Sequence, residues 1–367
     1  MRGGTCPCGE KYNQRDTRAL PGEMSTDSCR TEPGDVGALA EIAALAVRTA
    51  VEGPWRSGAF AALARHGVLA RFVPADAGGT GASEPRLVET LAAVAERCLT
   101  TALALSQWAA AVRIVTGSAR SRDRLPALAR GAHLTTVGIS QLTTSRQHGS
   151  APALLAAPAG DAWRLDGLCP WVTGADSVDT IVAGAATAAG DRVFCVVPTD
   201  AAGLEVGPPL EMLALTGSRT AAVRFRGVRA AEVIPAASDG PRTGGLATTA
   251  LAVGATRAAL ALVRAESAAR PGLEPVALGL GGEVDELASR LTAAATLGTA
   301  PADRDRLRAD ANSLVVRAAQ AALTAAKGAG FVRGHPAERL ARESLFFLVW
   351  SCPQAVTEAF LCDLTAG

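Results

Sequence analysis

Apolar residues recur at three- and four-residue steps from Val36 onward, and this spacing places them on one face of a helix. The first such stretch contains Leu39, Ile42 and Leu45. Gly, Pro, Asp and Ser residues interrupt the pattern and mark the turns. The first part of the chain is therefore predicted to be helical. Further helices are predicted at residues 59–66, 86–98 and 103–115.

After Leu134 the pattern changes to short β-branched or alternating segments separated by Gly, Pro and Asp. Such segments predict a small antiparallel sheet or barrel. Beyond Gly240 long helical patterns return, and they predict a second helical bundle. The strand segments are residues 135–140, 162–165, 180–183, 193–197 and 221–225, and the helical segments are 246–268, 282–297, 303–327 and 336–350.

This order of patterns predicts an α+β fold with three domains. An N-terminal helical domain is expected at residues 36–134, a central antiparallel β domain at 135–238 and a C-terminal four-helix bundle at 239–367. Residues 1–35 mix Gly, Pro, Arg, Asp and Thr without periodicity, so they are predicted to be a disordered leader. The leader lacks the apolar segment of a signal peptide, and the expected location is cytoplasmic.

Composition and charge narrow the choice of partner. The chain is 49% hydrophobic and 19% charged, which is typical of a globular protein. Its formal net charge is +1 with both signs spread along the sequence, so neither nucleic acid nor an acidic membrane is expected to bind. The apolar run at residues 246–262 is interrupted by Thr and Arg and is expected to be too short to span a bilayer. A small organic ligand is the expected partner.

Eight cysteines are spread along the chain without a CxxC pair, and no histidine stands near them at metal-ligand spacing. This distribution predicts reduced thiols of a cytosolic protein and no metal site. The cysteines are Cys6, Cys8, Cys29, Cys98, Cys169, Cys195, Cys352 and Cys362.

Five short motifs follow one another along the predicted domains. They are VPADAGGTGA at 73–82, GS at 117–118 with LPALARG at 125–131, WRLDG at 163–167 with WVTGAD at 171–176, TGSRT at 216–220 with Val223, Phe225 and Val228, and GAGF at 328–331 with HPAERLARE at 335–343. In order and spacing they resemble motifs of the acyl-CoA dehydrogenase family over residues 36–367.

The resemblance implies an FAD between the β domain and the C-terminal bundle, with an acyl thioester lying across the flavin. In that family a carboxylate removes the α-proton while the β-hydrogen passes to the flavin as hydride, so the redox step belongs to the cofactor. The resemblance also implies an oligomer, either a homodimer or homotetramer or a heteromer with a related chain.

Five residues match cofactor positions of the family. Trp171 and Thr173 match the segment against the isoalloxazine ring, and Ser140 replaces a threonine that contacts the pyrimidine edge. Arg270 stands where the family places an arginine on the FAD pyrophosphate, and Lys327 replaces a glycine near the phosphates. For both cations a solvated surface role is the alternative. Gln107, Trp108, Trp350 and Ser351 are predicted to line the substrate pocket.

The catalytic carboxylate is the main departure from the family. Ser351 stands at the usual glutamate position, and Thr248 stands at the alternative one. A hydroxyl cannot abstract an α-proton unaided, so the catalytic residue is unknown. Glu343 matches a structural aspartate, Cys352 is expected to be an inert thiol, and His335 is expected to serve packing.

The sequence is compatible with three functions. The first is an FAD-dependent oxidoreductase of specialised metabolism that acts on a CoA-bound or carrier-bound acyl thioester without the usual base. The second is a non-catalytic partner subunit of a heteromeric acyl-CoA dehydrogenase, which the degraded adenine-side motif around Lys327 would fit. The third is a non-redox enzyme, such as a cyclase or isomerase, that uses the acyl pocket as a shaped cavity.

Overall fold

The computed structural model describes residues 33–56, 58–143, 152–230, 232–236, 245–350, 352, 356–358 and 361. These residues all belong to one compact unit, residues 33–367. The predicted leader is described only from Pro33, where the first helix begins. Four of the cysteines and Ser351 lie outside the described residues.

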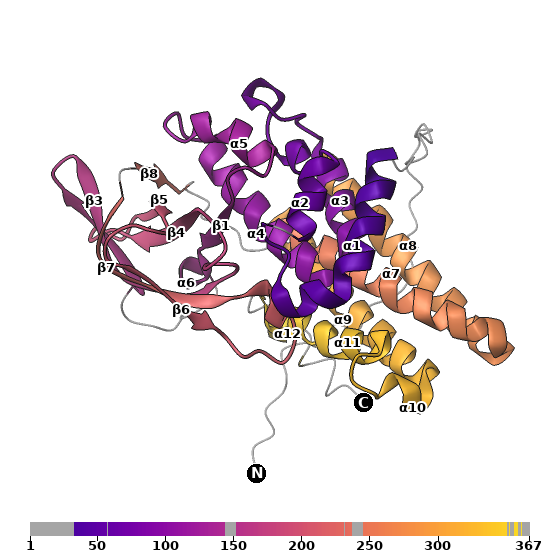
Figure 1. Cartoon of the computed structure of the whole chain (residues 1–367). Helices are drawn as coiled ribbons and strands as arrows, with labels where there is room; N and C mark the ends of the chain where they lie inside the picture. Colours follow the sequence, from indigo (N-terminus) through magenta and orange to yellow (C-terminus); the bar gives the residue numbers. More distant parts are fainter. Residues whose placement is uncertain are drawn as a thin grey trace, which may run out of the picture. The chain divides into compact units, whose positions relative to one another are not determined.

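The N-terminal part is helical, as predicted (Figure 1). The helix predicted at 103–115 begins four residues earlier, because Cys98 is extended and separates two helices that follow directly on one another. A proline near the start of α3 fits the first turn, where its missing N–H costs no hydrogen bond. The helices are α1 (Pro33–Glu52), α2 (Ala59–Arg65), α3 (Glu84–Arg97), α4 (Leu99–Thr116) and α5 (Leu125–Ala129).

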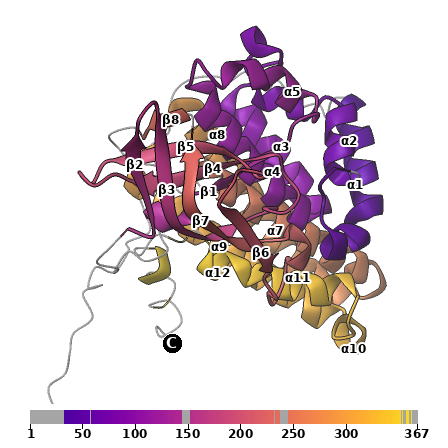
Figure 2. The same cartoon turned by 60° about the vertical axis from the view of Figure 1, so that its left-hand side comes forward.

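The middle of the described chain forms one mainly antiparallel sheet in the order β6-β7-β3-β2-β4-β5-β8, shown from another side in Figure 2. β1 pairs with β4 in parallel, which is an exception to the predicted antiparallel arrangement. The short helix α6 (Ser140–Thr143) follows β1 where the sequence predicted strand up to residue 140. The strands are β1 (Thr135–Gly138), β2 (Leu154–Ala159), β3 (Ala162–Val172), β4 (Thr180–Ala186), β5 (Arg192–Pro198), β6 (Leu204–Pro209), β7 (Ala221–Ala230) and β8 (Glu232–Pro235).

The C-terminal part is again helical, but its helix bounds differ from the prediction. The second helix begins at Glu274, before the expected residue 282, because its glycines at 279, 281 and 282 remain helical. The last expected helix ends early, at Ser344. The helices are α7 (Gly245–Ala269), α8 (Glu274–Leu297), α9 (Pro301–Ala325), α10 (Lys327–Gly330), α11 (Pro336–Ser344) and α12 (Phe346–Val349).

Helix α7 corrects one expectation. With 25 residues it is long and apolar enough to cross a membrane by length and composition, so the predicted shortness was wrong. However, 67% of its apolar window is buried against other parts of the chain. Gly254 shows how close this packing is, because a Cβ atom there would lie 2.1 Å from the carbonyl oxygen of Ala92 in α3. These features are those of a core helix.

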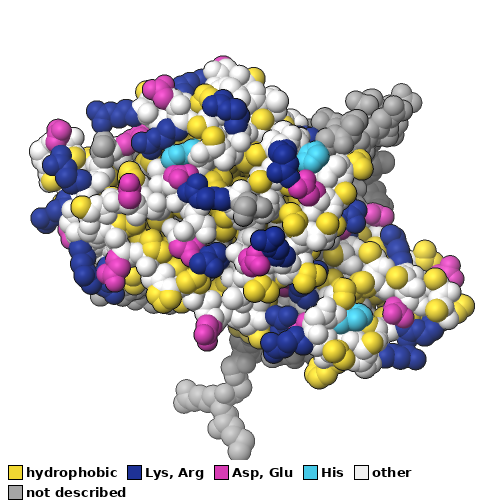
Figure 3. All heavy atoms as spheres, viewed as in Figure 1, with side chains coloured by type: hydrophobic (Ala, Val, Ile, Leu, Met, Phe, Trp, Pro, Cys, Tyr) yellow, Lys and Arg dark blue, Asp and Glu magenta, His cyan; other side chains and the backbone are white. Residues whose placement is uncertain are grey.

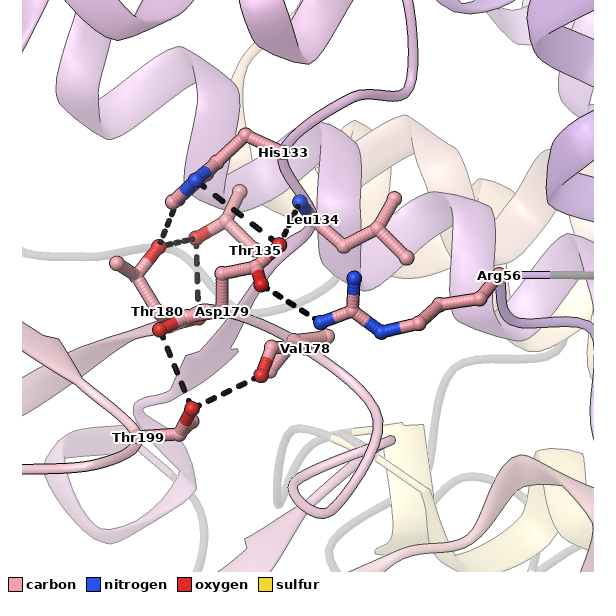
Figure 4. Close-up of polar contacts among 8 residues, drawn as sticks. All are labelled: Arg56, His133, Leu134, Thr135, Val178, Asp179, Thr180 and Thr199. Carbon is pink, nitrogen blue, oxygen red and sulfur yellow. Dashed lines mark hydrogen bonds and ion pairs between the residues drawn. The ribbon is translucent and has the colours of Figure 1, made fainter.

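A network of polar contacts around Asp179 joins the N-terminal helices to the sheet (Figure 4). Asp179 and Leu134 directly precede the parallel strands β4 and β1. The Asp179 carboxylate accepts 2.6 Å and 2.8 Å hydrogen bonds from Arg56 Nη2 and the Leu134 N–H. The Asp179 carbonyl accepts a bond from the Thr199 N–H at 3.0 Å. One residue thus holds the starts of two strands and the segment between α1 and α2.

The charge of Asp179 is stabilised in the fold. Burial by itself raises the pKa of this carboxyl, but the bonds from Leu134 and Arg56 outweigh burial, and the net pKa lies below its ordinary value. Burial also lowers the pKa of the adjoining His133, which bonds to the Thr180 hydroxyl at 3.1 Å. The network therefore stabilises the fold most when Asp179 is ionised and His133 is neutral.

We expect Asp179→Ala to lower the free energy of unfolding by about 1–3 kcal/mol, because the Leu134 N–H and Arg56 lose their acceptor. Asp161→Ala removes an exposed carboxylate that pairs with the exposed Arg229, and it should cost less than about 0.5 kcal/mol. Urea unfolding of both variants measures the difference. Because the folded pKa is lowered, the cost of losing Asp179 should shrink as the pH falls below about 4. Equal costs for the two variants would contradict this role.

Candidate functional site

The end of β3 exposes an aromatic face. A register irregularity between Cys169 and Val172 interrupts the pairing of β3 with β7. At this irregularity Trp171 is 41% exposed, whereas Val172 and Thr173 are fully buried. A large exposed aromatic side chain beside a fixed backbone suits contact with a flat ligand.

The Thr173 hydroxyl is held in a small buried network. Its Oγ1 lies 3.2 Å from Thr220 Oγ1, which lies 2.8 Å from Ser218 Oγ. The next residue, Gly174, has a φ of 66° and packs on the Trp55 ring, where a Cβ would lie 2.1 Å from Trp55 Cζ2. The backbone after Thr173 is therefore fixed by close packing as well as by hydrogen bonds.

Ser140 lies near this strand end, at the start of α6. Gly138, two residues earlier, lies against β3, because a Cβ on it would be 3.0 Å from Val172 Cγ2. The Gln141 amide donates bonds of 2.9 Å and 2.6 Å to the carbonyls of Gly138 and Gly184. Its Oε1 is buried and has no hydrogen-bond partner in the described part of the chain. Gln141 Oε1 is thus an unsatisfied buried acceptor next to Ser140, and the sequence prediction did not include this residue.

The C-terminal helices reach the same region through the loop that follows β6. Arg342 Nη1 in α11 donates a 3.0 Å bond to the Leu213 carbonyl. The same loop bonds the Leu210 N–H to the Thr220 carbonyl at 2.8 Å, next to the Thr173 network. In Figures 1 and 2, α12 lies beside β6. Trp350 follows α12 directly and stacks on Phe346 with ring centroids 5.1 Å apart.

The other predicted pocket residues have mixed surroundings. Trp108 is fully buried and packs edge-on against Phe60 and Phe72, so it serves the aromatic core of the helical part. Gln107 is half-buried and donates to the Ser106 hydroxyl at 3.1 Å. Thr248 is buried in the first turn of α7. The pocket role of Trp108 and Gln107 stays a prediction, as does the match of Thr248 to the alternative glutamate position, and Ser351 lies outside the described residues.

Arg270 and Lys327 lie near one another, away from the end of β3. Arg270 Nη2 donates to the Ala325 carbonyl, two residues before Lys327. Arg270 also pairs with Glu266 at 2.5 Å, so part of its hydrogen-bonding capacity is used within the chain. Figures 1 and 2 both show α10, which begins at Lys327, far from β3. Within one chain these cations are thus not brought together with Trp171 and Thr173.

For His335, Glu343 and Cys352 the sequence predicted structural rather than catalytic roles. His335 caps α11, because its Nδ1 accepts the Ala337 N–H at 3.1 Å. Glu343 is fully buried, and its Oε1 lies 3.9 Å from Arg339 Nε. Burial raises the pKa of Glu343 to about 7, although Arg339 and Arg342 offset part of this effect. Cys352 is half-buried with its Sγ 3.9 Å from Asn312 Nδ2.

Comparison with known proteins relates the fold to flavoenzymes. No protein-family model and no curated protein matches the sequence. Among solved structures, glutaryl-CoA dehydrogenase in complex with glutaryl-CoA superposes with a TM-score of 0.76 at 18% identity, covering 92% of this chain and 97% of the other. The glutaryl-CoA dehydrogenase of Mycobacterium smegmatis in complex with FADH2 superposes at 0.73 and 18%, covering 92% and 95%.

A third solved structure has a different ligand. KijD3 in complex with FMN and dTDP-3-amino-2,3,6-trideoxy-4-keto-3-methyl-D-glucose superposes with a TM-score of 0.72 at 19% identity, covering 92% of this chain and 94% of the other. The chain therefore has the acyl-CoA dehydrogenase fold, as its five motifs predicted. Proteins with this fold include enzymes that act on different classes of substrate.

The face of the molecule seen in Figure 3 carries basic and acidic side chains interspersed. Ion pairs among the described residues include Arg317 with Glu283 and Arg113 with Glu84. On this face, oppositely charged side chains alternate, so it presents no extended field of one sign to a polyanion. The candidate site, by contrast, is defined by neutral polar and aromatic groups at the end of β3.

We expect Glu343→Gln to stabilise the protein at pH 8 by roughly 2–4 kcal/mol and to have little effect at pH 5. The folded-state pKa of Glu343 is about 7, above the unfolded value, so the wild-type chain loses stability as the pH rises toward 7. Unfolding at both pH values measures the effect.

Glu338→Gln on the same helix is the matched control. The bond from Arg342 lowers the pKa of Glu338, so its carboxylate favours the fold above its ordinary pKa. This control should lose stability at pH 8. An identical response of both variants to pH would contradict the buried-acid interpretation of Glu343.

Proposed function

We propose that this chain is a flavin-dependent oxidoreductase of the acyl-CoA dehydrogenase type, which binds FAD and acts on an acyl thioester carried by coenzyme A or by a carrier protein. It works without the usual glutamate base, in the cytoplasm and in specialised metabolism, and it assembles as a homo-oligomer. The exposed Trp171 beside the buried Thr173 network is the single observation that carries this proposal.

The side chains at the end of β3 fit a flavin. Trp171 offers a flat face for a ring system, and the packing of Gly174 fixes the backbone next to it. Gln141 Oε1, which has no hydrogen-bond partner among the described residues, would accept the N–H of a pyrimidine edge, the part of the flavin for which the sequence predicted Ser140. Satisfying a buried acceptor of this kind stabilises a complex by about 1–3 kcal/mol.

When bound, the flavin supplies two-electron redox chemistry, and the chain supplies binding and orientation. Thr173, Thr220 and Ser218 hold a row of hydroxyls that is rigid before any ligand arrives. A preorganised geometry of this kind lowers the entropy lost when a reactive complex forms. Thr248 carries no ionisable group, so its position does not supply a base.

The first test is the visible absorption spectrum of the purified chain, followed by anaerobic addition of acyl thioesters. The proposal requires a yellow protein that bleaches with at least one thioester. A yellow protein that never bleaches would fit a structural flavin, and a substrate changed without a change in oxidation level would favour the non-redox alternative. A colourless but folded protein would contradict the proposal that the chain alone is a flavin-dependent oxidoreductase.

We expect Trp171→Leu to weaken flavin binding about three- to tenfold, because the aromatic contact contributes about 0.5–1.5 kcal/mol. The side chain is largely exposed, so thermal stability should stay within about 2 °C of the wild type. Trp163→Leu, near the other end of β3, is the control and should leave flavin affinity unchanged. Equal flavin affinity in both variants would remove Trp171 from the site.

A non-catalytic partner subunit is the second candidate, and the pairing of Arg270 favours it. Because Glu266 and the Ala325 carbonyl already engage Arg270, this guanidinium is less available to a pyrophosphate. A chain of this kind would bind the dinucleotide weakly alone and more tightly beside a related chain that retains the glutamate. Reconstitution with such a companion distinguishes the two candidates.

We expect Glu266→Gln to raise the affinity for FAD about two- to fivefold by releasing Arg270 for the pyrophosphate. FMN lacks this group, so its affinity should not change, and the comparison needs no activity assay. Glu283→Gln, which breaks an exposed pair with Arg317, is the control. An equal gain for FMN, or none for FAD, would show that Arg270 does not meet the pyrophosphate.

A further inference from the structure

A buried pair of side chains in α9 contacts the end of α12. Arg308 is 4% exposed and Asn312 is 2% exposed, although both are strongly polar. They stand four residues apart and therefore on one face of the helix. Arg308 Nε donates to Asn312 Oδ1 at 2.9 Å, which fixes the two side chains relative to each other.

Both side chains donate to backbone carbonyls at the end of α12. Arg308 Nη2 bonds to the Trp350 carbonyl at 2.9 Å, and Asn312 Nδ2 bonds to the Phe347 carbonyl at 2.8 Å. The last carbonyls of a helix have no partner within the helix, so side chains or water must satisfy them. Asn312 Nδ2 also lies 3.9 Å from the Sγ of Cys352, which follows Trp350 by two residues in the sequence.

Keeping a charge at this depth is costly. Burial lowers the pKa of Arg308 to about 10, so the guanidinium is still charged at neutral pH. In the described part of the chain, Arg308 donates hydrogen bonds to the Asn312 amide and the Trp350 carbonyl, and both acceptors are neutral. An apolar residue of similar size would fill the same space without this cost. Such an apolar residue would not hydrogen-bond to the chain after α12, so it would not fix the conformation of that chain as Arg308 does.

We propose that Arg308 and Asn312 are positioning residues that clamp the chain as it leaves α12 and orient Trp350 for the substrate. The capped carbonyls set the extended conformation of Trp350, whose φ and ψ are −79° and 124°. That conformation accompanies the stacking of the indole on Phe346. The inference rests on the proposed function in so far as Trp350 belongs to the thioester pocket.

The test uses the Cys352 thiol as a local reporter in the full-length chain. Arg308→Met, Asn312→Ala and Arg308→Lys are compared with the wild type by reaction with N-ethylmaleimide, and labelled peptides are identified by mass spectrometry. The buried thiols of Cys169 and Cys195 report global unfolding in the same sample. Arg317→Met, on the exposed part of α9, is the matched control.

We expect Arg308→Met and Asn312→Ala to speed labelling of Cys352 about tenfold or more, while Cys169 and Cys195 stay protected. The affinity for a thioester, measured from the perturbation of the flavin spectrum, should fall about three- to tenfold with flavin affinity unchanged. Arg308→Lys should recover part of both effects, since its ammonium donates to one carbonyl.

Unchanged Cys352 labelling in both variants would overturn the clamp. If labelling is faster but thioester affinity is unchanged, the clamp exists, but the proposal that it orients Trp350 for the substrate is wrong. If Arg308→Met exposes all thiols together, it has unfolded, and Asn312→Ala decides. If the wild-type chain binds neither flavin nor thioester, the proposed function is wrong, and so is the role of Arg308 and Asn312 in substrate binding. The labelling would still decide whether the clamp exists.

Discussion

The arrangement of this protein depends on how the sheet is attached to the helices, and Asp179 is central to that attachment. The parallel pairing of β1 with β4 brings Leu134 next to Asp179, although the two stand 45 residues apart. One carboxylate then satisfies the Leu134 N–H and the Arg56 guanidinium together. A hydrogen bond to a charged group is stronger than a neutral one, and a partly buried network increases its effect.

The candidate site follows from the same attachment. Gly174 packs on Trp55, the residue before Arg56, so the end of β3 and the segment between α1 and α2 are fixed to each other. With the backbone held there, the β3 irregularity exposes Trp171 and buries Thr173. Arg342 approaches from the other side and bonds to the Leu213 carbonyl. The site thus lies where a few contacts join the end of β3, the segment between α1 and α2, and helix α11.

Much of the fold was predictable because its signals are local. The three-part order and most elements follow from hydrophobic periodicity, and the five motifs identified the fold. Strands β2, β6 and β8 were missed because they are short, and each contains proline or small residues that resemble loop sequence. The start of α8 was misplaced because its glycines look like turn residues, yet tertiary packing kept them helical.

The site was predictable only in part. Trp171, Thr173 and Ser140 were predicted from motifs and stay predictions as flavin contacts, and the structure places the α6 turn beside the end of β3. Gln141, Arg308 and Asn312 were missed, although an arginine and an asparagine four residues apart among apolar neighbours were a visible signal. The pocket assignment of Trp108 stays a prediction, and its ring contacts with Phe60 and Phe72 could not be predicted from the sequence.

The sequence by itself determined the order of helices and strands, the motif positions and the absence of a carboxylate at residues 248 and 351, because these are properties of neighbouring residues or of single positions. Only the tertiary structure decided that Arg56 meets Asp179 across 123 residues and that Arg308 meets the Trp350 carbonyl across 42. Such contacts depend on how distant segments pack, and local periodicity carries no information about which charged side chain will meet which partner.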